Sequence, residues 1–135
     1  MDARSASLAD LDGLAALWAA AGLRFRPEQL ADEVVGVLRH DAGLALVIED
    51  GGAIVASVLG TFDGRRGWVN RLATHPDHRG RGLAQLLVAE LETRLRSRGC
   101  RKLNLLVEPD NDDVVAWYER LGYRRDELIF MQKLL

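Results

Sequence analysis

The chemically most informative stretch of the chain is Arg79-Gly80-Arg81-Gly82-Leu83-Ala84. A strand-like run, Trp68 to Thr74, precedes it, and an amphipathic helical pattern follows it at once. Glycine tolerates positive φ and lets a ligand approach the backbone, and the free N–H groups at a helix N-terminus carry partial positive charge. The stretch therefore predicts an anion cradle whose natural guest is a phosphate or a pyrophosphate.

Two familiar phosphate-binding loops do not fit this stretch. A P-loop needs a Gly-Lys pair, which the chain lacks. The dinucleotide fingerprint needs Gly or Ala where the chain has Gln85, and it belongs in a βαβ unit that is not found here. Arg79, Gly82 and Ala84 instead fit the pattern Q/R-x-x-G-x-G/A, which resembles the acyl-CoA loop of the GNAT acetyltransferase superfamily.

The resemblance extends over the second half of the chain. Upstream, Leu72 to Arg79 is similar to the fourth strand of that family and its exit. Downstream, Asn111, Tyr118 and Leu121-Gly122-Tyr123 match the family's N-x-x-A-x-x-x-Y-x-x-L-G-F helix, with Val114 at the small position. Because both motifs occur in order and are joined by a helix and a strand, the chain is identified as a member of the GNAT acetyltransferases, and this resemblance implies acetyl-CoA as cosubstrate and no metal.

The resemblance also implies which residues bind acetyl-CoA. In the family a bulge frees the backbone of the fourth strand to pair with pantetheine, and the loop with the following helix start holds the pyrophosphate. The positions concerned are Leu72, Ala73, Thr74, Arg79, Gly80, Arg81, Gly82, Leu83, Ala84, Gln85 and Asn111. Three points stay open: whether the strand is bulged, whether the two arginines contact phosphate or only supply positive field, and whether Asn111 only caps its helix.

Acetyl transfer from a thioester to an amine requires a base for the amine, stabilisation of an oxyanion and an acid for the leaving thiolate. Tyr118 lies two helical turns after Asn111, and a phenol with a pKa of about 10 is close to a thiol. We therefore predict Tyr118 as the general acid, which is also the family's usual one. The predicted base is Glu108, and a water held by Asn70 or Asn104 is the alternative.

The composition excludes several other functions. A net charge of −2 gives no electrostatic case for nucleic acid, and no aromatic residue interleaves with the basic stretch Arg94 to Lys102. His75, Asp77 and His78 lack a fourth ligand for a metal site, and the single Cys100 cannot form an internal disulfide. No membrane span or signal peptide is visible, so we expect a cytoplasmic protein without a membrane partner.

The length of 135 residues predicts a single domain, residues 1–135. Its pattern predicts a mixed α/β fold of the GNAT type, in which helices flank a largely antiparallel sheet in the order β-α-α-β-β-β-α-β-α-β(-β). The elements expected in turn are a strand at 3–7, helices at 8–21 and 27–40, strands at 44–49, 53–62 and 67–74, a helix at 83–98, a strand at 102–107, a helix at 112–121 and a strand at 128–134, with any seventh strand squeezed into 122–125. The exposed final strand would offer an edge for a homodimer.

The acceptor is expected to be a small-molecule or peptide amine. By resemblance its pocket involves Trp18, the segment Leu23 to Pro27, the turn Phe62 to Arg66 and the C-terminal strand. Arginines in these segments could bind a carboxylate, and Glu33 or Asp63 an ammonium. Acidic residues outnumber basic ones up to about residue 60, which favours a cationic acceptor. The alternative function is a non-catalytic acyl-CoA-binding module, because the predicted fourth and fifth strands contain no carboxylate.

Overall fold

The computed structural model describes all residues, 1–135, as two units, residues 1–105 and residues 106–135. The first unit contains a five-stranded sheet with the strand order β1-β2-β3-β4-β5. Its strands are β1 (Ala3–Ser5), β2 (Ala45–Asp50), β3 (Ala53–Phe62), β4 (Gly67–Thr74) and β5 (Leu103–Asn104). The first three pairings are antiparallel and the pairing of β4 with β5 is parallel, so the predicted mixed, largely antiparallel sheet is confirmed.

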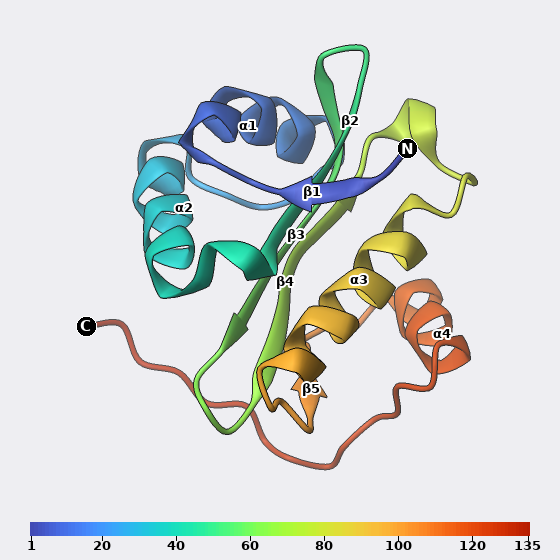
Figure 1. The fold of residues 1–135 in the computed structure, drawn as a ribbon. Coiled ribbons are helices and arrows are strands. Elements are labelled where there is room, and N and C mark those ends of the chain that lie inside the picture. Colours follow the sequence, from blue (N-terminus) through green and yellow to red (C-terminus); the bar gives the residue numbers. More distant parts are fainter. The chain divides into compact units, whose positions relative to one another are not determined.

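Helices cover both faces of this sheet (Figure 1). The first unit holds α1 (Leu11–Ala20), α2 (Pro27–Asp41) and α3 (Leu83–Ser97), with short 3-10 turns η1 (Leu8–Asp10), η2 (Ala42–Leu44) and η3 (Pro76–His78). The second unit holds α4 (Asp112–Arg120). None of these helices combines the length and apolar character that crossing a bilayer would need.

Local sequence chemistry sets several element boundaries as predicted. The Ser7 side chain accepts a hydrogen bond from the backbone of Ala9, and the carboxylate of Asp10 accepts one from the backbone N–H of Ser7, so the two residues form a capping box. Gly51 and Gly52, at φ values of 58° and 85°, form the tight turn between β2 and β3. These local signals explain why the meander from β2 to β4 could be predicted from the sequence.

Two apolar clusters sandwich the sheet. On one face, Leu14, Leu17 and Trp18 of α1 pack with Leu30 and Val34 of α2 against the sheet. On the other face, α3 contributes the buried residues Leu83, Leu87, Leu91 and Leu95. Successive residues of β2 belong alternately to the two clusters, so this strand is buried on both sides and reads as one apolar run.

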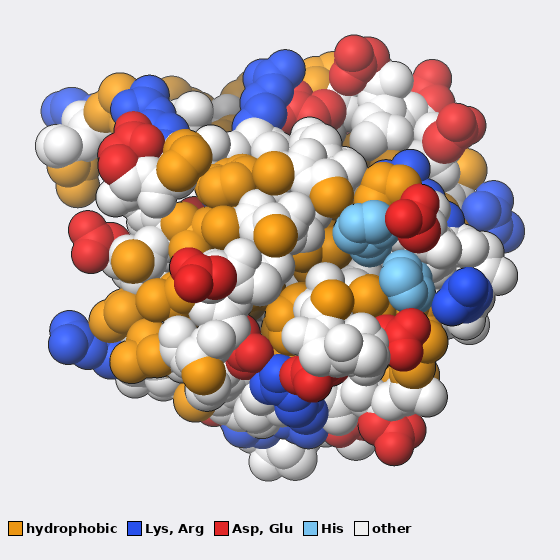
Figure 2. All heavy atoms as spheres, turned by 90° about the horizontal axis from the view of Figure 1, so that it is seen from above, with side chains coloured by type: hydrophobic (Ala, Val, Ile, Leu, Met, Phe, Trp, Pro, Cys, Tyr) orange, Lys and Arg blue, Asp and Glu red, His pale blue; other side chains and the backbone are white.

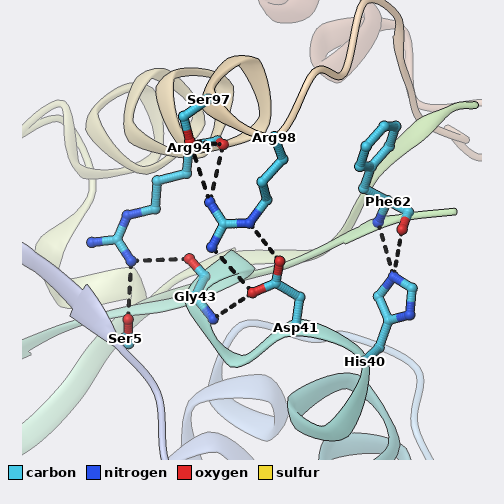
Figure 3. Close-up of polar contacts among 8 residues, drawn as sticks. All are labelled: Ser5, His40, Asp41, Gly43, Phe62, Arg94, Ser97 and Arg98. Atoms are coloured by element: carbon cyan, nitrogen blue, oxygen red, sulfur yellow. Dashed lines mark hydrogen bonds and ion pairs between the residues drawn. The ribbon is translucent and has the colours of Figure 1, made fainter. Parts of the chain in front are cut away.

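The C-terminal half of α3 is held by two arginines rather than standing free in solvent (Figure 3). Arg94 donates through Nη1 to the Ser5 hydroxyl and to the carbonyl oxygen of Gly43, each at 2.9 Å. Arg98 forms a salt bridge with Asp41. These two arginines of the basic stretch are therefore paired rather than free in solvent, and they fix the direction of α3 against β1 and η2.

Two predicted strands differ in the structure. The strand expected at Lys102 to Val107 is reduced to the two residues of β5, and it lies at the edge of the sheet rather than centrally, because it pairs only with Gly67 and Trp68 of β4. Residues 122–125 and 128–134 form no strand. Apolar side chains there, such as Ile129 and Met131, are exposed and do not pack on a sheet. Because no final strand forms, the argument that its edge would form a homodimer no longer applies.

Candidate functional site

Strand β4 carries a bulge at Arg71 and Leu72. Ala73 pairs with Ser57, and Asn70 pairs with Leu59. Between these two pairs β3 has one residue, whereas β4 has two, Arg71 and Leu72, as in a β-bulge. Arg71 has a φ of 55°, and it is the only non-glycine residue of the chain with positive φ. The bulge that the sequence left open is therefore present, and it uses a backbone conformation that an arginine rarely adopts.

A buried hydrogen-bond chain holds the backbone of this bulge. The Ser57 hydroxyl donates to the carbonyl oxygen of Arg71 at 2.9 Å, and the Trp18 indole Nε1–H donates to the same hydroxyl oxygen at 2.9 Å. Ser57 and Trp18 have no exposed surface. A buried hydroxyl with both partners satisfied holds its neighbours firmly, so α1 and β3 together fix the position of the Arg71 carbonyl.

The Arg71 side chain makes a second set of contacts. Its Nε and Nη2 donate to the two carboxylate oxygens of Glu33 at 2.8 and 2.7 Å, and its Nη1 donates to the carbonyl oxygen of Arg24 at 2.6 Å. The guanidinium carbon lies 4.9 Å from the centre of the Trp18 ring. A residue in the left-handed region costs about 1–3 kcal/mol, and these contacts offset that cost.

Beyond Trp68, the edge of β4 opposite β3 has no strand partner, because β5 pairs only with Gly67 and Trp68. The bulge lies within this open segment, which ends at Thr74. The predicted cofactor positions Leu72, Ala73 and Thr74 thus lie on a free edge. Backbone N–H and C=O groups on such an edge can pair with an extended ligand as an added strand would.

The Gly-rich loop adopts the conformation that its sequence predicts. Gly80 and Gly82 have φ values of 78° and 75°, and a Cβ built on either would meet no atom within 4 Å. Backbone conformation, rather than crowding, therefore demands glycine at both positions. The side chains of Arg79 and Arg81 are exposed and form no ion pair.

The N-terminus of α3 directly follows this loop. Gly82 supplies no side-chain cap, so the first N–H groups of the helix, those of Leu83, Ala84 and Gln85, have no partner within the helix. Helix α4, which also has a predicted site residue at its start, is capped by the Asn111 side chain instead. The loop and the start of α3 therefore form one positively polarised concave stretch of backbone.

His75 and His78 tie this loop to the sheet. The backbone N–H of His75 donates to the carbonyl oxygen of Val55 at 2.8 Å, and its Nδ1 accepts from the backbone of Asp77 at 3.1 Å. His78 Nε2 lies 3.2 Å from Asp50 Oδ2 at the end of β2. The two rings are 5.7 Å apart, and histidine side chains gather together on the face shown in Figure 2. Both histidines thus stabilise the path from β4 into α3.

The second unit contains Asn111 and Tyr118 on one helix. The Asn111 side chain accepts from the backbone N–H of Val114 at 3.4 Å, which confirms its N-cap role. Tyr118 is buried and packs edge-on against Trp117 and Tyr123. Burial raises the pKa of Tyr118 to about 12. In the free protein the phenol is therefore a weaker acid than predicted, because its pKa lies above that of a thiol rather than close to it.

This pKa can be measured because the chain has only two tyrosines. The measurement is the difference in tyrosinate absorbance between the parent protein and Tyr118→Phe as the pH is raised. We expect this difference to titrate with a midpoint near pH 12 rather than at the ordinary value of about 10. Since the folded pKa is raised, the stability that this phenol contributes is fully present below pH of about 10 and is lost as the pH rises toward 12. A difference titration with its midpoint near 10 would contradict the burial of Tyr118.

The candidate base Glu108 is exposed, and its carboxylate makes no ion pair or hydrogen bond. Its backbone carbonyl oxygen accepts from the N–H of Asn111 at 3.0 Å. The alternative water-holding side chains lie on the sheet: Asn70 is exposed next to the bulge, and Asn104 is half-buried opposite Trp68.

A cleft of about 480 Å³ lies beside the bulge in the first unit. It is lined by Leu23, Arg24, Phe25, Arg26, Gln29, Glu33 and Arg71. Part of the predicted acceptor segment, Leu23 to Arg26, therefore lines a cavity. Trp18 and the turn Phe62 to Arg66 do not line it. The Asp63 carboxylate closes its own turn by accepting from the backbone N–H groups of Arg65 and Arg66.

Sequence reasoning missed Ser57 and the role of Arg71. One signal for Ser57 was present, since it is the only polar side chain in the run from Ile54 to Leu59. A buried tryptophan also needs an acceptor for its N–H, which such a serine can provide. No pattern in the sequence pointed to Arg71 as the residue with positive φ.

The profile of the family described as Acetyltransferase (GNAT) family matches residues 11–123. An acetyltransferase of Yersinia enterocolitica is 50% identical over 98 residues, which cover 73% of this chain and 70% of that protein. An acetyltransferase of Sodalis glossinidius is 46% identical over 99 residues, with the same coverage.

Solved structures share the fold. An aminoglycoside 6'-N-acetyltransferase from Acinetobacter haemolyticus superposes with a TM-score of 0.82 at 18% identity, covering 100% of this chain and 99% of that one. The PaiA N-acetyltransferase of Thermoplasma acidophilum, solved with coenzyme A, gives a TM-score of 0.80 at 16% identity, with coverages of 95% and 92%. The family match and the identity to the acetyltransferases establish that the chain belongs to the GNAT family and is an acetyltransferase.

Proposed function

We propose that the protein transfers an acetyl group from acetyl-CoA to a primary amine of a small-molecule or peptide acceptor, by direct attack within a ternary complex. One arrangement carries the proposal: the open, bulged end of β4 runs through the Gly-rich loop into the uncapped N-terminus of α3. An extended chain ending in a pyrophosphate has the shape and charge that such a continuous backbone surface binds.

In this proposal each part of acetyl-CoA has its own contact. The pantetheine arm pairs with backbone groups of Leu72, Ala73 and Thr74 along the free edge of β4. The pyrophosphate lies on Gly80, Gly82 and the N–H groups that open α3, and Arg79 and Arg81 add positive charge. Asn111 contacts the pantetheine arm in addition to capping α4. The binding needs no metal ion.

The chemistry follows from these contacts. The amine nitrogen attacks the thioester carbon, and the resulting oxyanion accepts a hydrogen bond from a backbone N–H freed by the bulge. The carbon–sulfur bond then breaks, and Tyr118 gives its phenolic proton to the departing thiolate. The amine proton goes to Glu108 or to a water held by Asn70 or Asn104. With a pKa of about 12, the phenol stays protonated at every working pH and therefore always carries the proton that it donates.

Structural relatives support acyl-CoA and an amine as the two substrates. One of them, the aminoglycoside acetyltransferase AAC(6')-Iy, was solved with a bisubstrate analogue of CoA and acetylneamine, at a TM-score of 0.82 and 16% identity. Another, Naa20 of Chaetomium thermophilum, was solved with a bisubstrate analogue as well. These ligands belong to those proteins, so they support the donor more strongly than any acceptor.

The experiment is turnover with a panel of amines. Purified protein, acetyl-CoA and each amine are incubated, free CoA is measured with a thiol reagent, and the product is identified by mass spectrometry. We expect CoA release above the amine-free rate together with an equal amount of an acetylated amine. Acetyl-CoA binding with no acetylated product from any amine would contradict the proposed transfer.

A further inference from the structure

The cleft beside the bulge carries unbalanced positive charge. Three of its lining residues are arginines and one is a glutamate, Glu33. Both carboxylate oxygens of Glu33 are already engaged by Arg71, so this pair is neutral. Arg24 and Arg26 are exposed at the cleft and form no ion pair or side-chain hydrogen bond. Two guanidinium groups therefore remain free to bind an anion.

The surrounding backbone adds to this charge. Helix α2 begins at Pro27, its N-cap residue is Arg26, and no side chain caps it. The partial positive charge of a 15-residue helix therefore opens toward the segment that lines the cleft. Glu28 in the first turn of α2 does not line the cleft. Apart from Glu33, the acidic residues that favoured a cationic acceptor do not line the cleft, and two of them, Asp10 and Asp41, are paired with arginines.

The cleft also has a direction. Arg71 lines it and belongs to the β4 bulge, so one end adjoins the backbone where the acetyl group is expected. Phe25 forms an apolar wall, fixed by an edge-on contact with Trp18 at 5.7 Å between ring centres. A ligand whose amine reaches the bulge would pass along this wall and place its other end near Arg24 and Arg26.

We propose that the acceptor is a primary amine that also bears a carboxylate, and that Arg24 and Arg26 bind that carboxylate. The inference rests on the proposed function and specifies its acceptor. Planar guanidinium groups suit a carboxylate because they form paired, charge-assisted hydrogen bonds. A polycationic amine is disfavoured at this site because it would face two unpaired arginines and a helix N-terminus.

The first test compares matched acceptors. L-Amino acids and their C-terminal amides present the same α-amine and side chain, but the amide lacks the carboxylate. With saturating acetyl-CoA, we expect kcat/KM for the best amino acid to exceed that for its own amide, and that for spermidine, by about 10- to 100-fold. Equal or better turnover of the amides or of spermidine would overturn the inference.

The second test assigns the preference to the two arginines. Arg24→Gln and Arg26→Gln should each lower kcat/KM for the carboxylate acceptor about 10-fold or more and leave that for the amide within about twofold. Acetyl-CoA affinity should not change. Arg39→Gln is the matched control, because Arg39 is an exposed arginine on α2 that does not line the cleft. Equal losses for acid and amide would show that the arginines act only through structure.

A binding measurement separates failure of the inference from failure of the proposed function. N-Acetyl-L-leucine and N-acetyl-L-leucinamide, the products of such a reaction, are titrated into the protein with CoA. Tighter binding of the acid in the parent protein, lost in Arg24→Gln, supports the carboxylate site even if no amine is turned over. If amines without a carboxylate are acetylated and the acid binds no better than the amide, the transferase function stands and the inference is wrong.

Discussion

Replacing Tyr118 with phenylalanine should lower kcat for acetyl transfer by about 10²- to 10⁴-fold and leave the dissociation constant of acetyl-CoA within about twofold. The substitution removes only the hydroxyl group, so the thiolate must leave without its proton donor. The apolar body of the side chain, which packs on Trp117 and Tyr123, is retained. Steady-state release of CoA gives kcat, and calorimetric titration gives the affinity.

Tyr123→Phe is the matched control for this experiment. It deletes the phenolic hydroxyl of the only other tyrosine, which packs on Tyr118 at 5.4 Å between ring centres. We expect its kcat to stay within about threefold of the parent protein, because the proposal gives this hydroxyl no role in proton transfer. Full turnover in Tyr118→Phe, or an equal loss in both variants, would show that Tyr118 is not the general acid.

The second large effect is expected at Arg71. Arg71→Ala should destabilise the fold by about 2–4 kcal/mol, because it removes the salt bridge to Glu33 and the contact with Trp18, which offset the strain of the positive φ in the parent protein. The kcat/KM for acetyl transfer should fall by about 10- to 100-fold, since the bulge that frees the backbone edge loses its anchor. Urea unfolding gives the stability, and CoA release gives the activity.

Arg71→Gly separates the backbone from the side chain. Glycine adopts a φ of 55° without strain, so this variant should be more stable than Arg71→Ala by about 1 kcal/mol, while it lacks the same side-chain contacts. Glu33→Gln tests the salt bridge alone and should cost less than either. An alanine variant as stable as the parent protein would contradict the view that Arg71 holds the bulge in a strained conformation.

The features that could be predicted from the sequence are those that short stretches of chain specify. A turn or a helix cap depends on residues that are neighbours in the sequence. Examples are the turn at Gly51-Gly52, the cap formed by Ser7 with Asp10, and the helix start after Gly82. The family motifs then indicated where acetyl-CoA and the acid belong.

The bulge and the cleft could not be predicted in this way, because distant residues create them. The Arg71 conformation depends on Ser57, which is 14 positions away, and on Glu33, which is 38 positions away. The anchoring of α3 likewise depends on Arg98 meeting Asp41 across 57 positions. The excess of acidic residues in the first part of the chain favoured a cationic acceptor. The unpaired arginines that line the cleft instead favour an acceptor with an anionic group. Only the fold decides which charges remain unpaired.

The most direct test of acetyl-CoA-dependent function is a calorimetric titration of acetyl-CoA into the purified protein, with NAD and ATP as controls. All three ligands carry phosphates, but only acetyl-CoA has a pantetheine arm that can pair with the open edge of β4. We predict selective binding of acetyl-CoA with a dissociation constant in the micromolar range, and weaker binding in Gly82→Val, whose φ of 75° valine does not tolerate. No acetyl-CoA binding, or an equal response to all three ligands, would contradict the assignment of β4 and its loop as an acyl-CoA site.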